Sequence, residues 1–216
     1  MHPIVTSLTI AAAVADGVAL SQALGAAGNL VLNGSLVTGG NAVFDAPRRV
    51  AIASAGNDSG ITFTVTGTAR PEMGNIVQSE TITGGNGATV YTTQDFATVT
   101  SISASGPVAT TVLAGTNGIA SGPWVPWDNY AVDFQLSVAG FVMSGAPTWQ
   151  LDYTYDDVYG TWLPANVPFP RPIASTQLVG ITGNADAQIN SLIRASRLTL
   201  TAVGGMQLTQ QQQQGI

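Results

Sequence analysis

The sequence is poor in the residues that most enzymes use for chemistry. Its 216 residues include no cysteine, no lysine and a single histidine. Without cysteine the chain forms no disulfide and no thiolate-bound metal site. The histidine, His2, lies beside Pro3 at the start of the chain, whereas a Ser-His-Asp arrangement needs an internal histidine. These absences predict a protein without enzymatic activity, cofactor or bound metal.

Charged residues are also scarce, at only 8% of the chain, against about 25% in ordinary globular proteins. The 45% of apolar residues and the 25 glycines do not fit a disordered chain, which combines high charge with low hydrophobicity. The composition favours a sheet protein whose solvent-facing positions are Thr, Ser, Asn and Gln. It also suits a protein that packs against neighbouring chains, where buried charge is costly.

Positive charge comes from six arginines only, and the net charge is −6. The pairs Arg48 with Arg49 and Arg194 with Arg197 are the only clusters, which is too little to hold a phosphate backbone, so no nucleic-acid partner is expected. Arginine keeps its charge and forms bidentate pairs with carboxylates, which suits interfaces. Arg48 and Arg49 are therefore predicted to make a contact between units or between subunits.

The apolar segment from Leu8 to Leu24 is a poor membrane span, because Asp16 and Gly17 interrupt it. The first residues lack the positive charge with which a signal peptide begins. We therefore expect no membrane partner, and synthesis in a reducing cytosol.

The stretch from Ile61 to Ile102 carries the clearest structural pattern. Ile61, Phe63 and Val65 alternate with threonines, and a period of two indicates a strand with one buried face. Further strand-like runs follow, separated by glycine-rich turns. About seven short strands in the first half, with turn signals every eight to twelve residues, predict a sandwich or a barrel.

Two segments leave alternatives open. Helix and strand compete between Ala11 and Ala27, where alanine and leucine favour a short helix, although Asp16 and Gly17 favour a turn inside it. The tail from Gln210 to Gln214 is of low complexity, which predicts disorder, or an arm that becomes ordered in an assembly.

The segment SGPWVPWDN, residues 121–129, differs in composition from the residues around it, because it contains two prolines and two tryptophans. We interpret it as the crossing between an N-terminal domain, residues 1–120, and a C-terminal domain, residues 121–216. The predicted fold is all-β, with two sandwich-like or jelly-roll-like units in tandem and extended terminal arms. Trp124 and Trp127 are expected to wedge between the units or against a neighbouring chain, or to stack on a sugar.

The second half holds the only carboxylate cluster, Asp152, Asp156 and Asp157. Asp152 and Asp156 are four residues apart on a predicted strand, so both should lie on its solvent face. A polar sheet face, paired with Arg194 or Arg197 on a neighbouring strand, is the favoured interpretation. A Ca²⁺ site is the alternative.

Several segments resemble, in the same order, segments of bacteriophage virion structural proteins. They are DGVALSQALGAAGNLVLNGSL at 16–36, ITFTVTGT at 61–68, SETITGGN at 79–86, FATVTSI at 96–102, YTYDDV at 153–158 and the strands of 180–203. The resemblance implies extended structure and turns in 16–36, which gives the extended alternative there the same weight as the helix. It also implies a place in the phage virion, with synthesis in the cytoplasm of a bacterial host.

Within that class the first expectation is a capsid decoration or cement protein, a homotrimer that binds the major capsid protein on the outer surface of the head and stabilises it. A neck or tail protein, bound to other neck or tail proteins, is the alternative. A carbohydrate-binding module on the virion is a further alternative, with Trp124, Trp127, Trp149 or Trp162 stacking on sugars.

Overall fold

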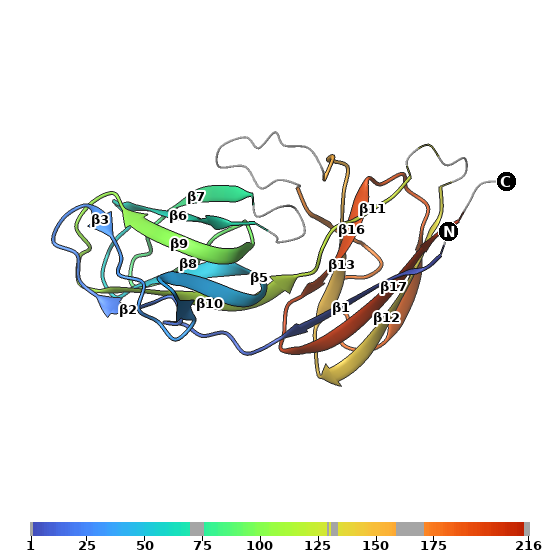
Figure 1. Ribbon diagram of the computed structural model, residues 1–216, viewed down its shortest axis with the longest axis horizontal. Coiled ribbons are helices and arrows are strands. Elements are labelled where there is room, and N and C mark those ends of the chain that lie inside the picture. The colour runs from blue at the N-terminus through green and yellow to red at the C-terminus, as the bar shows by residue number, and fades with distance from the viewer. Residues whose placement is uncertain (1, 70–75, 129, 131–133, 159–170, 214–216) are drawn as a thin grey trace. The chain divides into compact units, whose positions relative to one another are not determined.

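The computed structural model describes residues 2–69, 76–128, 130, 134–158 and 171–213 (Figure 1). Every regular element in these ranges is a β-strand, and the strands form two antiparallel sheets, of 4 and 13 strands, that do not close into a barrel. The all-β prediction is therefore confirmed. Within the described ranges no helix has the length and hydropathy that a membrane span requires.

The contacts divide the chain into two compact units. Of the described residues, one unit holds 12–117 and the other holds 2–11, 118–158 and 171–213. We call them the central unit and the terminal unit. The sequence placed residues 4–10 with the first half of the chain, but in the structure they join the terminal unit, because they pair with the last strand.

The central unit is built on the strand order β5-β9-β6-β7, with shorter strands beside it. Its strands are β2 (Ala19–Gln22), β3 (Gly28–Asn29), β4 (Val37–Thr38), β5 (Asn41–Ser54), β6 (Thr62–Thr68), β7 (Val77–Thr83), β8 (Thr89–Tyr91), β9 (Phe96–Ala104) and β10 (Val112–Ser121), whose last residues continue into the terminal unit.

The alternation in β6 gives the result that the sequence predicted. Phe63 and Val65 are fully buried in the core of the central unit. On the other face, Thr64 shares a hydroxyl hydrogen bond of 2.9 Å with Thr81, and Thr66 shares one of 3.0 Å with Ser79. One face of the strand therefore packs in the core while the other forms a ladder of hydroxyl groups across to β7.

The segment 11–27 forms no helix, so the extended alternative is the correct one. Ala19 to Gln22 forms β2, which pairs with β10, and Val18 donates a backbone hydrogen bond of 2.9 Å to the Ala114 carbonyl. Val18 and Ala19 are fully buried. Pairing with a distant strand overrides the local helix preference of alanine and leucine, which is worth only tenths of a kcal/mol per residue.

The terminal unit contains a four-stranded sheet in the order β1-β17-β12-β15, and Figure 1 shows β1, β17 and β12 side by side. The strands of this unit are β1 (Ile4–Ile10), β11 (Val125–Pro126), β12 (Leu136–Gly145), β13 (Trp149–Thr154), β14 (Ile173–Ala174), β15 (Ala185–Ile189), β16 (Ala195–Leu200) and β17 (Gly204–Gln212).

The expectation of extended terminal arms is wrong for the described ends of the chain. β1 pairs along its length with β17, from Ile4 opposite Gln210 to Ile10 opposite Gly204. Gln210 and Gln212, which belong to the low-complexity tail, are buried. Gln210 to Gln212 are ordered because they pair with β12, and Gln210 also pairs with β1 on the other edge.

Candidate functional site

The two tryptophans of the predicted crossing both lie beside β16. The Trp127 indole N–H donates a 2.8 Å hydrogen bond to the Ser196 hydroxyl, which in turn donates to the side-chain carbonyl of Gln210. The guanidinium carbon of Arg197 lies 4.7 Å from the ring centroid of Trp124, within the range of a cation–π interaction. Trp124 and Trp127 therefore anchor the segment before β12 onto β16.

Burial decides what these rings can do. Trp124 is 8% exposed, Trp127 is 6% exposed and Trp149 is fully buried. None of the three presents an open ring face on which a sugar could stack in the isolated chain. The fourth candidate, Trp162, lies outside the described residues. The predicted role of Trp124 and Trp127 in a contact between units or subunits stays a prediction.

Asp152 lies inside the protein, so its predicted place on a solvent face is wrong. β13 and β16 are in register with Asp152 opposite Arg197. The carboxylate accepts hydrogen bonds from the Arg197 Nε at 3.2 Å, from the Thr199 hydroxyl at 2.6 Å and from the Gln150 amide at 2.7 Å. The predicted pairing with Arg197 is confirmed. The charge is tolerated in the interior because it is paired and hydrogen-bonded.

The other two carboxylates of the cluster have separate surroundings. Asp156 forms a salt bridge of 2.6 Å with Arg171 and also accepts the Arg171 backbone N–H at 2.7 Å. The hydrogen bonds from Arg171 lower the pKa of Asp156 below its ordinary value, and the same pair raises the pKa of Arg171. Asp157 lines a small hollow of about 260 Å³ beside Trp127 and Arg194.

The structure thus separates the sequence cluster. Asp152 and Asp156 each have their own arginine partner, and among the residues described no group of three or more His, Cys, Asp or Glu side chains could hold a metal ion.

Arg48 and Arg49 lie in the central unit, next to an interruption in β5. The pairing of β5 with β9 shifts register between Val43 and Arg48, around Pro47, as expected of a proline in a strand. Arg48 is almost fully buried and binds both carboxylate oxygens of Asp45, at 2.7 and 2.6 Å. Arg49 approaches Asp95 at 3.9 Å. Arg48 thus contributes to folding the bend, and the predicted interface role of both arginines stays a prediction.

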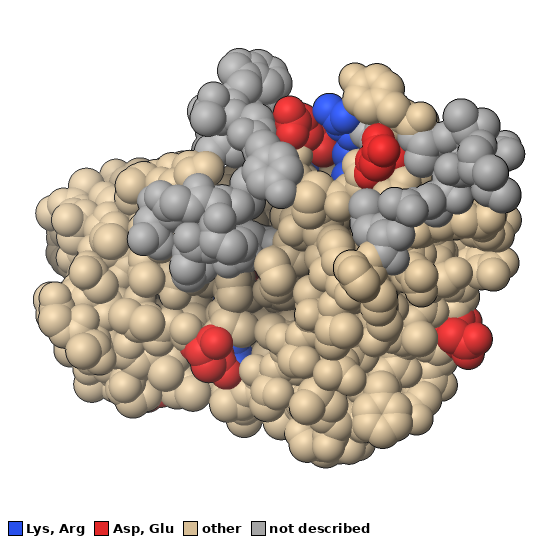
Figure 2. Space-filling view, turned by 45° about the vertical axis from the view of Figure 1, so that its right-hand side comes forward, with Lys and Arg blue, Asp and Glu red and all other residues tan. Residues whose placement is uncertain are grey.

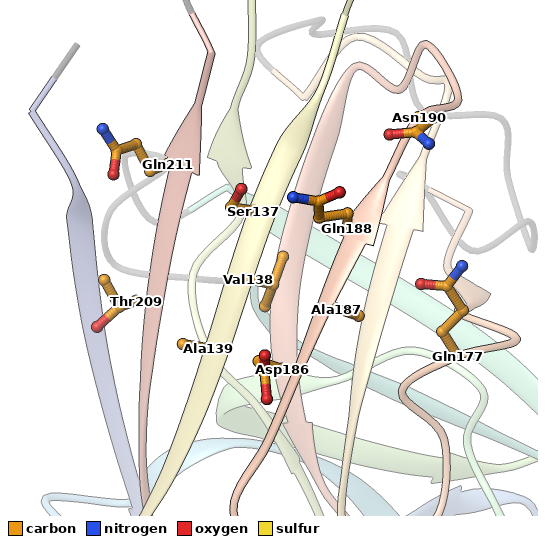
Figure 3. A pocket seen from close by; sticks show the side chains of 10 residues that line it. All are labelled: Ser137, Val138, Ala139, Gln177, Asp186, Ala187, Gln188, Asn190, Thr209 and Gln211. Carbon is orange, nitrogen blue, oxygen red and sulfur yellow. The ribbon is translucent and has the colours of Figure 1, made fainter.

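The feature that the sequence did not reveal is an open hollow of about 670 Å³ on the outer face of the four-stranded sheet (Figure 3). Side chains of β17, β12 and β15 line it, together with Gln177 from a connecting segment. Its lining is Ser137, Val138, Ala139, Gln177, Asp186, Ala187, Gln188, Asn190, Thr209 and Gln211.

Charged side chains are scarce on the face of the molecule that Figure 2 shows. Figure 2 shows one face on which Lys, Arg, Asp and Glu are confined to a few places among uncharged residues. No family model, no curated protein and no solved structure matches the chain.

Proposed function

We propose that this chain is a non-enzymatic structural component of a bacteriophage particle, and that it decorates and stabilises the outer surface of the head as a homotrimer. The observation that carries the proposal is the ordered series of segments, from residue 16 to residue 203, that resembles phage virion structural proteins. Those segments include the sequences of β6, β9 and β16, strands from both units.

The chemistry of the described carboxylates supports a structural role. Asp45, Asp152 and Asp156 each bind an arginine of the same chain. Glu80 accepts the backbone N–H groups of Thr93 and Gln94 at 2.7 and 2.8 Å. Each of these groups is used to hold the fold together, in a chain whose only histidine is His2.

We infer further that the terminal unit is a β-sandwich-like domain. A Cβ built on Gly140 of β12 would lie 2.4 Å from the Trp149 ring of β13, so this ring packs directly against the backbone of the four-stranded sheet. The Ser196–Gln210 hydrogen bond likewise joins a strand of the larger sheet to β17. Two sheets whose inner faces interlock in this way have the arrangement of a sandwich.

The proposal is tested by measuring the copy number of this chain in purified particles, by quantitative mass spectrometry against the major capsid protein. A decoration protein should occur in numbers comparable to the capsid protein, and particles that lack it should release their genome at lower temperature. A copy number that fits a single ring would place it in the neck or tail. Absence from the purified particle would refute the proposal altogether.

Light scattering of the purified chain tests the oligomeric state, for which we expect three times the chain mass of 22.0 kDa. Closed cyclic symmetry is the usual arrangement of soluble homo-oligomers. A monomer that stays monomeric on the particle would contradict this part of the proposal.

A further inference from the structure

The hollow on the outer face of the four-stranded sheet is a continuous surface made by three neighbouring strands. Ser137 lies opposite Gln188, and Ala139 lies opposite Asp186, across β12 and β15. On the other edge of β12, Ala139 lies opposite Thr209 of β17. Directly opposed residues share a face, so the small side chain of Ala139 forms the floor and longer side chains stand on both sides of it (Figure 3).

The lining has an unusual chemical composition for an open protein surface. The hollow is surrounded by four amide side chains and two hydroxyl groups. The amides belong to Gln177, Gln188, Asn190 and Gln211, and the hydroxyls belong to Ser137 and Thr209. Each amide and each hydroxyl can both donate and accept a hydrogen bond. The single charged group in the lining is the carboxylate of Asp186.

One of these amides is already oriented. The Gln135 amide donates to the Oε1 atom of Gln188 at 3.3 Å, so the Gln188 amino group can serve as a donor to a ligand. Holding a polar side chain before binding reduces the entropy cost of ordering it.

An exposed aromatic ring continues the same face. Phe141 follows Ala139 by two residues on β12, which places both on the outer face, and its side chain is 57% exposed. Phe141 lies opposite Gln207 of β17. The face therefore offers an apolar ring next to a field of neutral hydrogen-bonding groups.

From this arrangement we propose that the hollow binds a neutral oligosaccharide, a segment of a glycan chain. Sugar hydroxyls donate and accept hydrogen bonds as amides do, and the C–H face of a sugar ring packs on an aromatic ring such as that of Phe141. The volume of about 670 Å³ is in the range of small-molecule sites. The inference does not rest on the proposed place of the chain in a phage particle.

The same lining disfavours the other occupants. An anionic glycan or a nucleic acid needs arginine or lysine, whereas the lining contains neither and includes Asp186. A second copy of the chain would more commonly bury a core enriched in aromatic and apolar side chains, whereas six of the ten lining residues carry an amide or a hydroxyl group.

The test uses the full chain and three neutral probes, maltohexaose, cellohexaose and hexa-N-acetylchitohexaose, with heparin as the anionic comparison. Binding is measured by titration calorimetry, and the side-chain amide signals of glutamine and asparagine are followed by NMR. We expect at least one neutral probe to bind and to shift side-chain amide signals, and we expect heparin not to bind.

Two variants locate the site. Ala139→Arg fills the floor and should abolish binding, and the double variant Gln188→Ala, Gln211→Ala should weaken it by about tenfold or more, since each lost hydrogen bond contributes about 0.5–1.5 kcal/mol. Ala27→Arg adds the same charge at an exposed alanine of the central unit and should bind as the unchanged chain does. Thermal melting of each variant verifies that it is folded.

The proposal is overturned if no neutral probe binds at millimolar concentration, or if binding survives Ala139→Arg. It is also overturned if the chain self-associates and Ala139→Arg abolishes that association, because the occupant is then a second copy.

Discussion

The two units bury polar side chains in different ways. In the central unit, buried carboxylates bind backbone N–H groups of connections, as Glu80 does at Thr93 and Asp58 does at Ala109. In the terminal unit, buried polar side chains bind one another across strands, as Asp152 does with Arg197 and as Ser196 does with Gln210. Buried polar side chains therefore hold connections in place in the central unit, whereas they hold strands and sheets together in the terminal unit.

The difference follows from where the apolar residues lie. The core cluster of the central unit draws on aliphatic and aromatic residues of nearly all its strands, including Ile52, Phe63 and Ile102. In the terminal unit, β16 is buried on both faces although it reads Ala-Ser-Arg-Leu-Thr-Leu. Its polar residues must find partners inside the protein, because water does not reach them. Removing one partner should therefore cost more in the terminal unit.

The largest effect is expected for Asp152→Ala, which removes the Asp152 carboxylate from the buried ion pair with Arg197. Breaking a buried ion pair in this way costs about 3–5 kcal/mol of unfolding free energy. The double variant Asp152→Leu, Arg197→Met removes both charges and should recover most of the loss. The central unit contains no tryptophan, whereas Trp124, Trp127 and Trp149 lie in the terminal unit, so their fluorescence during urea unfolding reports on the terminal unit. Equal losses in the single and double variants would contradict the assignment.

A smaller and local effect is expected for Glu80→Ala in the central unit. Glu80 accepts hydrogen bonds from the Thr93 N–H and hydroxyl and from the Gln94 N–H, and a bond to a charged group contributes about 1.5–3 kcal/mol. The loss should stay near the lower figure, because the freed N–H groups can turn to water. Hydrogen exchange should speed up at Thr93 and Gln94, while the tryptophan transition stays unchanged. A shifted tryptophan transition would show that the units are not independent.

Substituting the two partners of the Ser196–Gln210 hydrogen bond should change the free energy of unfolding by different amounts. Ser196→Ala leaves the Trp127 indole N–H without its acceptor, at a cost of about 1–3 kcal/mol. Gln210→Leu should change stability by less than about 1 kcal/mol, because the Gln210 Nε2 atom is buried with no hydrogen-bond partner among the described residues. Urea unfolding followed by tryptophan fluorescence measures both. A large loss for Gln210→Leu would mean that this amide has a partner.

The sequence predicted the parts of the fold that local pattern controls. The alternation of apolar residues with threonines correctly predicted that Phe63 and Val65 are buried. The failures lie where distant segments decide the outcome. Gln210 and Gln212 are buried because β1 and β12 pair with β17, and nothing in a run of glutamines indicates such partners.

The candidate site shows the same limit more strongly. The hollow joins residues 137–139, 186–190 and 209–211, which are brought together only by strand pairing. Each contributes one to three ordinary polar residues, and such residues carry no motif. The aspartate cluster shows the reverse case. The sequence offered a Ca²⁺ site there as an alternative, whereas in the structure Asp152 and Asp156 form two separate ion pairs.

The smallest effect concerns pH and the partly exposed pair of Asp156 with Arg171, the counterpart of the buried Asp152 pair. The hydrogen bonds from Arg171 hold the pKa of Asp156 below its ordinary value of 3.8. A carboxylate with a lowered pKa in the folded state stabilises the fold fully above its ordinary value, and that stabilisation is lost as the pH falls through the lower, folded value. Asp156→Asn should therefore lower the melting temperature slightly at pH 7 and progressively less below pH 3.8. Melting curves of the unchanged chain and of Asp156→Asn, recorded from pH 7 to below pH 3.8, measure the difference. Arg171→Gln should show the same pH dependence as Asp156→Asn. A gap between Asp156→Asn and the unchanged chain that widens in acid would contradict the stabilising role of this pair.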